Sequence, residues 1–361
     1  MKKSTWFTFI FGETFIHSPT VKFFTLFFSA TLIIYLLVGE FYRFQSYDAI
    51  PQIQLIDMKM RKEIRDFTAI VKTGIHIRGF SNFDIDNDNF ITEMLVWFEC
   101  NADEVMPEVI DKFSFIHGDI LYKSDPDAQI ADNKMLIKYM VKVKFNAQLS
   151  HRHFPFDGHK VSMQMVNNFV SPGEMHYVTE ENNFALGQNL FSGSWELTGI
   201  DTAWGYLETT LDATEQKKVK KPIAIFTINV KNTGTRQALI LFFPLLATLL
   251  LSLFAFIIGV IGGALRFRMS LSALGTMIGY RFVIQRIMPD VGYFTTTDAI
   301  YSLFLAVAFL SFIGHSIVER LLKKENAKEV LNGLFAAEVA NSIFFFALNG
   351  ALLAGIGLIL W

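Results

Sequence analysis

The sequence predicts a β-sandwich domain followed by a four-helix transmembrane bundle, with one additional transmembrane helix at the N-terminal end. Of the 361 residues, 52% are hydrophobic and only 18% are charged, against roughly 25% in an average soluble protein. The long uncharged runs fall near the two ends of the chain. The middle is polar, and its apolar residues alternate as they do in half-buried strands.

Four runs without Asp, Glu, Lys or Arg predict membrane helices, at 23–39, 238–265, 299–318 and 339–361. The last three are long enough to cross the hydrocarbon core, which takes about 20 apolar residues. The first is longer than the apolar stretch of a signal peptide, and no small-residue cleavage site follows it. We therefore interpret residues 1–40 as a cytoplasmic stub with an uncleaved anchor, and a cleaved signal peptide is the alternative.

A fifth run, 269–288, is apolar but contains Arg281, Gln285 and Arg286. A helix this polar is not suited to face lipid on all sides, since charged groups inside a membrane usually face protein or water. We expect one face of this helix to line water or protein.

Basic residues near the ends of the predicted helices set the expected orientation. They precede the first helix, separate the second from the third and separate the fourth from the fifth: Lys2, Lys3, Arg266, Arg268, Arg320, Lys323, Lys324 and Lys328. With five spans, all of them fall on one side, which the positive-inside rule makes cytoplasmic. We expect a multi-pass protein of the cell (inner) membrane, with residues 41–236 and the C-terminus extracellular or periplasmic.

Residues 41–236 contain six runs that are typical of β-strands, separated by clusters of Asn, Asp, Pro and Gly. The runs are 69–78, 90–98, 135–145, 160–165, 195–200 and 223–230. Many short strands with turn-forming residues between them favour an antiparallel sandwich. The expected domains are therefore 1–40, a sandwich at 41–236 and a helical domain at 237–361.

Composition and motifs exclude several classes of function. The formal net charge of −2 disfavours a nucleic-acid binder, and the single cysteine excludes an intramolecular disulfide framework. The chain carries no nucleophile elbow, HExxH or Gly-rich phosphate loop. Residues 84–92 superficially resemble a calcium loop, but Asn89 and Leu95 stand where that loop needs Gly and Glu. We expect neither an enzyme, nor a cofactor, nor a metal site.

Four motifs occur in one order: a hairpin ending in a Trp strand at 79–99, HFPFDGHKV at 153–161, RFRMSLSALGTM at 266–277 and MPDVGYFTTTDAIYSLFLAVAF at 288–309. In this order they resemble the pentameric ligand-gated ion channels, the Cys-loop receptors and their prokaryotic relatives. The cysteines expected near Ala147 and Val161 are absent, as in prokaryotic members. The resemblance implies a homopentamer in which an agonist bound between adjacent sandwiches opens a pore for an inorganic ion.

The resemblance also implies a pore helix at about 267–288. Its water-facing stripe would comprise Arg266, Arg268, Ser272, Gly275, Gly279, Phe282 and Arg286. Rings of Arg at both mouths favour anions, and Phe282 is the candidate constriction. For Arg266 and Arg268, anchoring at the membrane interface is the alternative. Gly275 departs from the family, whose members usually carry Leu or Ile at this gate position.

The expected agonist site is a box of aromatic side chains that holds a cation over ring faces. The resemblance points to Trp97, Phe169, Trp204 and Tyr206, and ordinary core or rim positions are the alternative for each. The coupling residues it implies are Phe154, Pro155, Phe156, Asp157, Pro289, Tyr293 and Asp298. Asp157 and Asp298 are expected to act in structure and coupling rather than as metal ligands.

Three histidines, His151, His153 and His159, surround the FPFD turn, and histidine is the side chain that most often acts as a pH switch. A proton is therefore a second candidate stimulus beside a small-molecule agonist. The alternative function, motivated by Gly275, Gly279 and the added N-terminal helix, is a membrane-anchored sensor or scaffold that does not conduct ions.

Overall fold

The computed structural model describes residues 18–43, 46, 48, 53–55, 69–84, 88–171, 173–188, 190, 195–210, 218–322 and 327–361. The chain divides into two compact units. The β unit comprises residues 44–151 and 157–233, and the helical unit comprises residues 1–43, 152–156 and 234–361. Residues 152–156, inside the predicted sandwich domain, thus pack with the helices.

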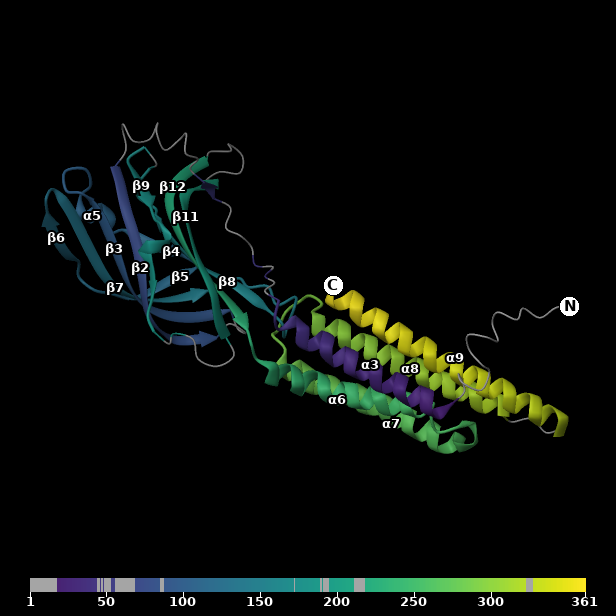
Figure 1. Cartoon of the computed structure of the whole chain (residues 1–361). Coiled ribbons are helices and arrows are strands. Elements are labelled where there is room, and N and C mark those ends of the chain that lie inside the picture. Colours follow the sequence, from purple (N-terminus) through teal and green to yellow (C-terminus); the bar gives the residue numbers. More distant parts are fainter. Residues whose placement is uncertain are drawn as a thin grey trace. The chain divides into compact units, whose positions relative to one another are not determined.

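The β unit is built on a single, mostly antiparallel sheet (Figure 1). Its strands are β1 (Gln54–Leu55), β2 (Ala69–Asp84), β3 (Asn89–Asn101), β4 (Phe113–Ile116), β5 (Gly118–Lys123), β6 (Asp127–Ala131), β7 (Lys134–Asn146), β8 (Gly158–Asn167), β9 (Met175–Val178), β10 (Phe184–Leu186), β11 (Trp195–Thr210) and β12 (Lys218–Asn232). Two short helical turns, α5 (Pro107–Ile110) and η2 (Glu181–Asn183), connect them.

The strand order is β1-β11-β12-β8-β4-β5-β7-β3-β2-β10, with β6 paired to β7 and β9 to β2. Among the described strands, only β9 and β10 run parallel to their partner, β2. Each of the six runs predicted from alternation lies inside a strand, which confirms those predictions. The sheet encloses one apolar core, so the coarse expectation of a β-rich domain is confirmed.

Alternation fixes which face of each strand is buried. On β3 and β7 every second side chain is buried, and Phe98 lies in the core with its ring centroid 5.2 Å from that of Phe113 and 6.2 Å from that of Tyr139. Burying one such aromatic side chain contributes about 1.5–3 kcal/mol. A shift of register by one residue would expose this whole set.

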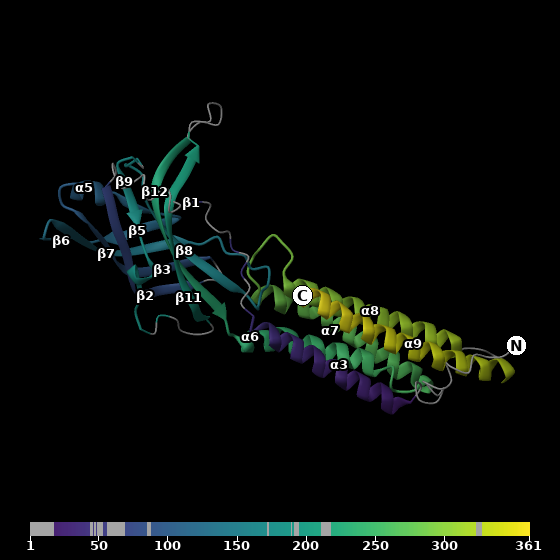
Figure 2. The same ribbon diagram turned by 45° about the horizontal axis from the view of Figure 1, so that its top comes forward.

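Among its described residues the helical unit contains five long helices, which run side by side in Figures 1 and 2. They are α3 (Pro19–Glu40), α6 (Thr235–Phe254), α7 (Gly263–Ile287), α8 (Thr296–Leu322) and α9 (Ala327–Leu360), with a 3₁₀ turn, η3 (Val260–Gly262), before α7. Helix α7 packs on α6 and α8, and α8 packs on α9. The added helix α3 packs on α6 and α9.

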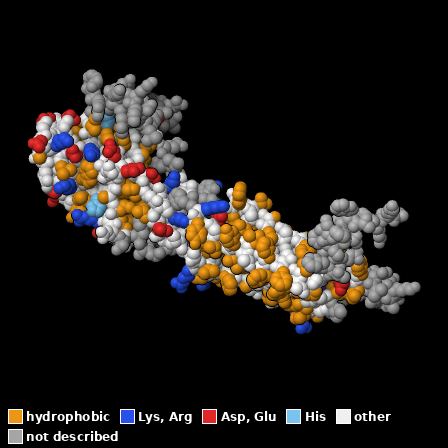
Figure 3. Space-filling view, in the orientation of Figure 1, with side chains coloured by type: hydrophobic (Ala, Val, Ile, Leu, Met, Phe, Trp, Pro, Cys, Tyr) orange, Lys and Arg blue, Asp and Glu red, His pale blue; other side chains and the backbone are white. Residues whose placement is uncertain are grey.

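Four of these helices are long and apolar enough to cross a membrane, at Pro19–Glu40, Thr235–Phe254, Thr296–Leu322 and Gly333–Leu360. Hydrophobic side chains cover much of the helical unit, whereas charged side chains are frequent on the β unit (Figure 3). The protein is therefore a membrane protein. Helix α7 is not among the four, as its Arg and Gln residues predicted.

One predicted helix is divided in the structure. The uncharged run 238–265 was expected to be continuous, but α6 ends at Phe254 and α7 begins at Gly263. Between them Gly259 has a φ of +38°, a conformation that residues with a Cβ rarely adopt. The chain reverses direction there, so Leu265 belongs to α7.

Candidate functional site

Helix α7 has two opposite faces of different character. Its buried residues are Arg266, Ser270, Ala273, Met277 and Ile284. Steps of three and four residues place them on one side of the helix, toward the other helices. A position two residues further along is rotated by about 200°, so it lies on the opposite side. That opposite face is exposed, and it comprises Arg268, Ser272, Gly275, Gly279, Phe282 and Arg286.

Arg266 is not part of this exposed face, and its assignment to the water-facing stripe is corrected. The side chain is buried inside the helical unit, where its Nε donates to the Ala255 carbonyl oxygen at 3.0 Å. Its Nη2 lies 3.0 Å from His315 Nδ1 and also donates to Asn341 Oδ1. Arg266 thus ties the start of α7 to the end of α6, to His315 of α8 and to Asn341 of α9, rather than lying on the exposed stripe.

The six residues of this face are small or polar except at one position, and the exposed apolar residues Leu271 and Ile278 flank them. A Cβ added to Gly275 or Gly279 would meet nothing within 4 Å, so packing within the chain does not require glycine at either. Phe282 is the large apolar residue of this face, and it is 71% exposed. Arg268 and Arg286 lie near the two ends of the face.

Residues 152–156 are held among the ends of three helices. The Phe154 carbonyl oxygen accepts a hydrogen bond of 2.8 Å from Thr297 Oγ1 at the start of α8, and the peptide bond to the buried Pro155 is cis. The Phe156 ring stacks on Phe242 of α6 with centroids 5.9 Å apart. Its edge meets Phe41, next to the end of α3, at 4.9 Å. Phe154, Pro155 and Phe156 are therefore anchored in the helical unit.

The segment between α7 and α8 is organised around Asp298. Its Oδ1 accepts a hydrogen bond of 2.7 Å from Arg281 of α7. Its Oδ2 accepts from the Thr295 backbone N–H at 3.1 Å, while Thr295 Oγ1 accepts from the Asp298 N–H at 3.2 Å. This is a capping box at the start of α8. Pro289, Tyr293 and Asp298 line one hollow of the helical unit together with Arg281.

Three of the predicted residues around the FPFD turn form a buried cluster in the β unit. His151 Nδ1 lies 3.6 Å from Asp157 Oδ2, and His159 Nε2 lies 4.0 Å from the same oxygen. His153 is not part of it, because its Nδ1 lies 3.4 Å from Thr296 Oγ1 in the helical unit.

Two carboxylates that were not predicted for this site complete the cluster. Asp88 Oδ1 lies 3.2 Å from His151 Nε2, and Asp48 Oδ1 lies 3.4 Å from His159 Nδ1. Burial lowers the pKa of His151, but Asp157 and Asp88 outweigh this effect and hold that pKa above its ordinary value. The spacing of His151, Asp157 and His159 in the sequence was a usable signal. No sequence signal connected Asp48 to the cluster, since it lies 111 residues before His159.

The four aromatic candidates lie at three places on the β unit. Trp97 is half-buried on the outer face of β3, above Gly74 of β2, where a Cβ would collide with its indole. Trp97 is therefore not among the fully buried residues of the apolar core. Phe169 follows β8 and is 71% exposed, with the Lys112 amine 5.0 Å from its ring centroid.

Trp204 and Tyr206 are half-buried on one face of β11, because they are two residues apart on a strand. The Tyr206 hydroxyl lies 2.5 Å from Nδ1 of His176, a buried residue of β9. Along the sheet, five strands separate β11 from the strand of Trp97. Trp97 and the β11 pair thus lie on different parts of the unit.

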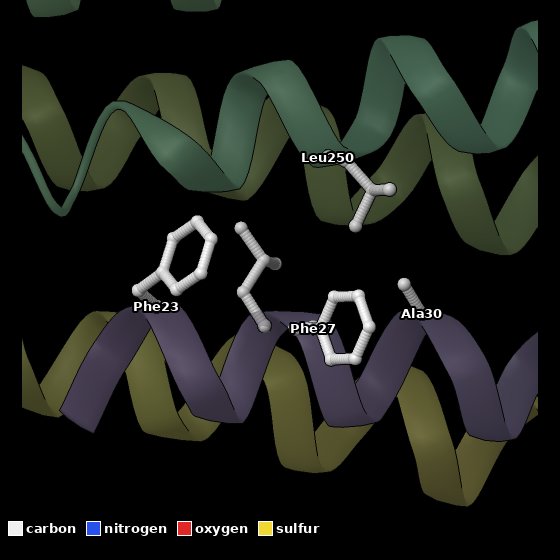
Figure 4. A pocket seen from close by; sticks show the side chains of 5 residues that line it. Phe23, Phe27, Ala30 and Leu250 are labelled. Atoms are coloured by element: carbon white, nitrogen blue, oxygen red, sulfur yellow. The ribbon is translucent and has the colours of Figure 1, made fainter. Parts of the chain in front are cut away.

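An apolar groove lies between α3 and α6 in the helical unit. Phe23, Phe27 and Ala30 of α3 line it together with Leu250 of α6 (Figure 4), and Leu26 completes the lining. These side chains offer no hydrogen-bonding group, so the groove provides apolar contact only.

No protein-family model matches this chain, and no curated protein is significantly similar to it. The functional assignment therefore rests on the geometry within the two units.

Proposed function

We propose that this chain is the subunit of a homopentameric ligand-gated ion channel of the cell membrane. The observation that supports the proposal is the two-faced helix α7. The six residues that we assign to its pore-facing stripe include two Arg, one Ser and two Gly beside Phe282, whereas the other four described long helices of the unit are apolar. A face with two arginines is costly in lipid but stable against water. Five copies around an axis would turn this face toward a shared aqueous pore.

The charges of this face favour a pore for anions. Arg268 and Arg286 are 18 residues apart, which corresponds to about 27 Å along a helix at about 1.5 Å per residue. In a pentamer each would form a ring of five positive charges near one mouth, and such rings select for anions. Phe282 lies one turn from Arg286 and would form the apolar constriction.

The proposed stimulus is an agonist or a proton bound by the β unit. With residues 41–236 on the extracellular or periplasmic side, Trp97 would face Phe169, Trp204 and Tyr206 of the neighbouring copy. Residues 152–156 offer a path for coupling, because they continue directly into β8 and are anchored by Thr297 and Phe242 in the helical unit. A ligand that binds one state better than the other shifts the equilibrium between closed and open pores.

Current through planar bilayers tests the proposal. Purified protein is reconstituted under a chloride gradient and recorded at neutral and acidic pH, as wild type and as Phe282→Ala. Phe243→Ala is the matched control, since Phe243 is 63% exposed on α6. We expect currents that reverse near the chloride equilibrium potential and that grow in Phe282→Ala but not in Phe243→Ala.

Other outcomes would revise the proposal in different ways. Reversal at the cation equilibrium potential would keep the channel and refute the anion selectivity. Silence of both the wild type and Phe282→Ala at both pH values would favour the alternative, a membrane-anchored sensor or scaffold that does not conduct. The exposed Gly275 and Gly279, which provide no apolar ring, are the feature consistent with that alternative.

A further inference from the structure

The buried cluster of the β unit has the composition of a metal site. His151, Asp157 and His159 each direct one ligand atom inward, and these atoms lie within 4.8 Å of one another. Within the part of the chain that the structure describes, His159 Nε2 and Asp157 Oδ1 are buried and have no hydrogen-bond partner. Buried polar atoms nearly always have a partner, so both are explained by a bound group.

The outer nitrogen of each imidazole already faces a carboxylate. His151 Nε2 faces Asp88 at 3.2 Å, and His159 Nδ1 faces Asp48 at 3.4 Å. A neutral imidazole that donates its proton outward directs a lone pair inward. Histidines that bind metals in proteins are oriented in this way, by a carboxylate on the other ring nitrogen.

The charge of the cluster also calls for a cation. The side chains of Asp157 and Asp48 are each only 3% exposed, so the cluster holds two buried carboxylates. Burying unbalanced charge is costly, and one divalent cation would compensate for both carboxylates. The Asp88 side chain on the outer nitrogen of His151 is 37% exposed, so the cluster reaches the surface on that side.

We propose that the β unit binds a zinc ion through His151 Nδ1, His159 Nε2 and the Asp157 carboxylate. Two nitrogens and one carboxylate suit a borderline metal such as Zn²⁺ better than Ca²⁺ or Mg²⁺, and a fourth position stays open. Ligand atoms about 2.1 Å from a tetrahedral zinc are about 3.4 Å apart. The distances to Asp157 Oδ2 are 3.6 and 4.0 Å and all three ligand atoms lie within 4.8 Å of one another, so side-chain rotations would have to draw them together around the ion.

Such an ion would join the two ends of the segment 152–156. His151 precedes this segment, and Asp157 and His159 follow it, so the ion would cross-link its two ends without cysteines. Zinc binding goes beyond the proposed channel function and does not depend on whether the pore conducts.

Zinc content and cobalt substitution test the site in the purified full-length protein in detergent. After equilibration with Zn²⁺ and removal of free metal, we expect about one zinc per chain in the wild type. Replacement by Co²⁺ should give the intense visible absorption of a four-coordinate site. This spectrum is recorded on the wild type and does not depend on any variant folding.

Variants separate the ligands from the residues that orient them. His159→Gln should abolish stoichiometric binding, and Asp48→Asn should weaken it by about 10- to 100-fold. The matched control is His153→Gln, which removes a neighbouring histidine outside the cluster and should bind like the wild type. Equal zinc content in His159→Gln and the wild type would mean adventitious binding only and would overturn the proposal. So would a wild type without zinc or without the cobalt spectrum.

Discussion

The contact between Arg281 and Asp298 should contribute a measurable coupling energy to the helical unit. Arg281 Nη1 and Asp298 Oδ1 are 2.7 Å apart, and the side chains are 34% and 8% exposed. A hydrogen bond to a charged group contributes about 1.5–3 kcal/mol when it is buried. Since the guanidinium is one-third exposed, solvent screening places the expected coupling near the lower limit, about 1.5 kcal/mol.

A double-mutant cycle isolates this energy from the other bonds of Asp298. The variants are Arg281→Gln, Asp298→Asn and the double variant. Asp298→Asn alone also weakens the capping box with Thr295, and the cycle cancels that part. The assay is unfolding by a denaturing detergent in a mild one, followed by far-ultraviolet circular dichroism, which reports the helices.

The control pair is Glu40 and Arg43, at 3.2 Å in the same unit, whose Arg side chain is 51% exposed. Exposed pairs at this spacing couple by only about 0.3–0.5 kcal/mol. If the Arg281–Asp298 cycle gave no more than this control, Asp298 would not connect α7 to α8 energetically, and its role as a coupling residue would be refuted.

Three other substitutions test other parts of the molecule. Gly275→Leu should lower single-channel conductance several-fold by adding an apolar ring, whereas Gly350→Leu, at an equally open glycine of α9, should leave it unchanged. Arg266→Met should lower the free energy of unfolding by about 3 kcal/mol, since it leaves buried polar partners unsatisfied. The control Arg268→Met, on the exposed face, should lower it by less than about 1 kcal/mol. The same detergent titration measures both. Burial lowers the pKa of His176 to about 4, whereas in the unfolded chain it is about 6.5. The contribution of the neutral ring to the free energy of unfolding is therefore fully present above about pH 6.5 and is lost as the pH falls toward 4. Thermal unfolding should record a loss of about 1–2 kcal/mol over this range after allowance for screening, and His176→Gln should flatten the profile.

Local patterns predicted most of the secondary structure because each of them has one dominant physical cause. Alternation predicted the strand 135–145, since every second side chain of β7 enters the core. Uncharged length predicted the membrane helices. The prediction of one continuous helix at 238–265 failed because an uncharged run does not show where the backbone changes direction. The chain turns at Gly259, inside this run.

The candidate site was only partly predictable. Helical geometry alone separates Arg266 from Arg268, since two residues rotate by about 200°, so the two could never share one stripe. The resemblance placed both arginines on the water-facing stripe because the motif matches in its order along the chain. The order of residues does not say on which side of the helix each one lies. The carboxylate of Asp48 could not be foreseen, because tertiary folding brings it to His159 across 111 residues.

The position of α3 between α6 and α9 sets an order of events during synthesis. Helix α3 leaves the ribosome before α6 and α9, and α9 is complete about 320 residues after α3, roughly 15 to 60 s at about 5–20 residues per second. During this time α3 lies in the bilayer without α9, one of its two neighbours, and its Lys22, buried in the finished unit, has to reach the interface along its own aliphatic stem. Assembly of the helical unit therefore waits for the last helix, and nascent chains that stall before α9 present an unpaired first helix to the insertion machinery.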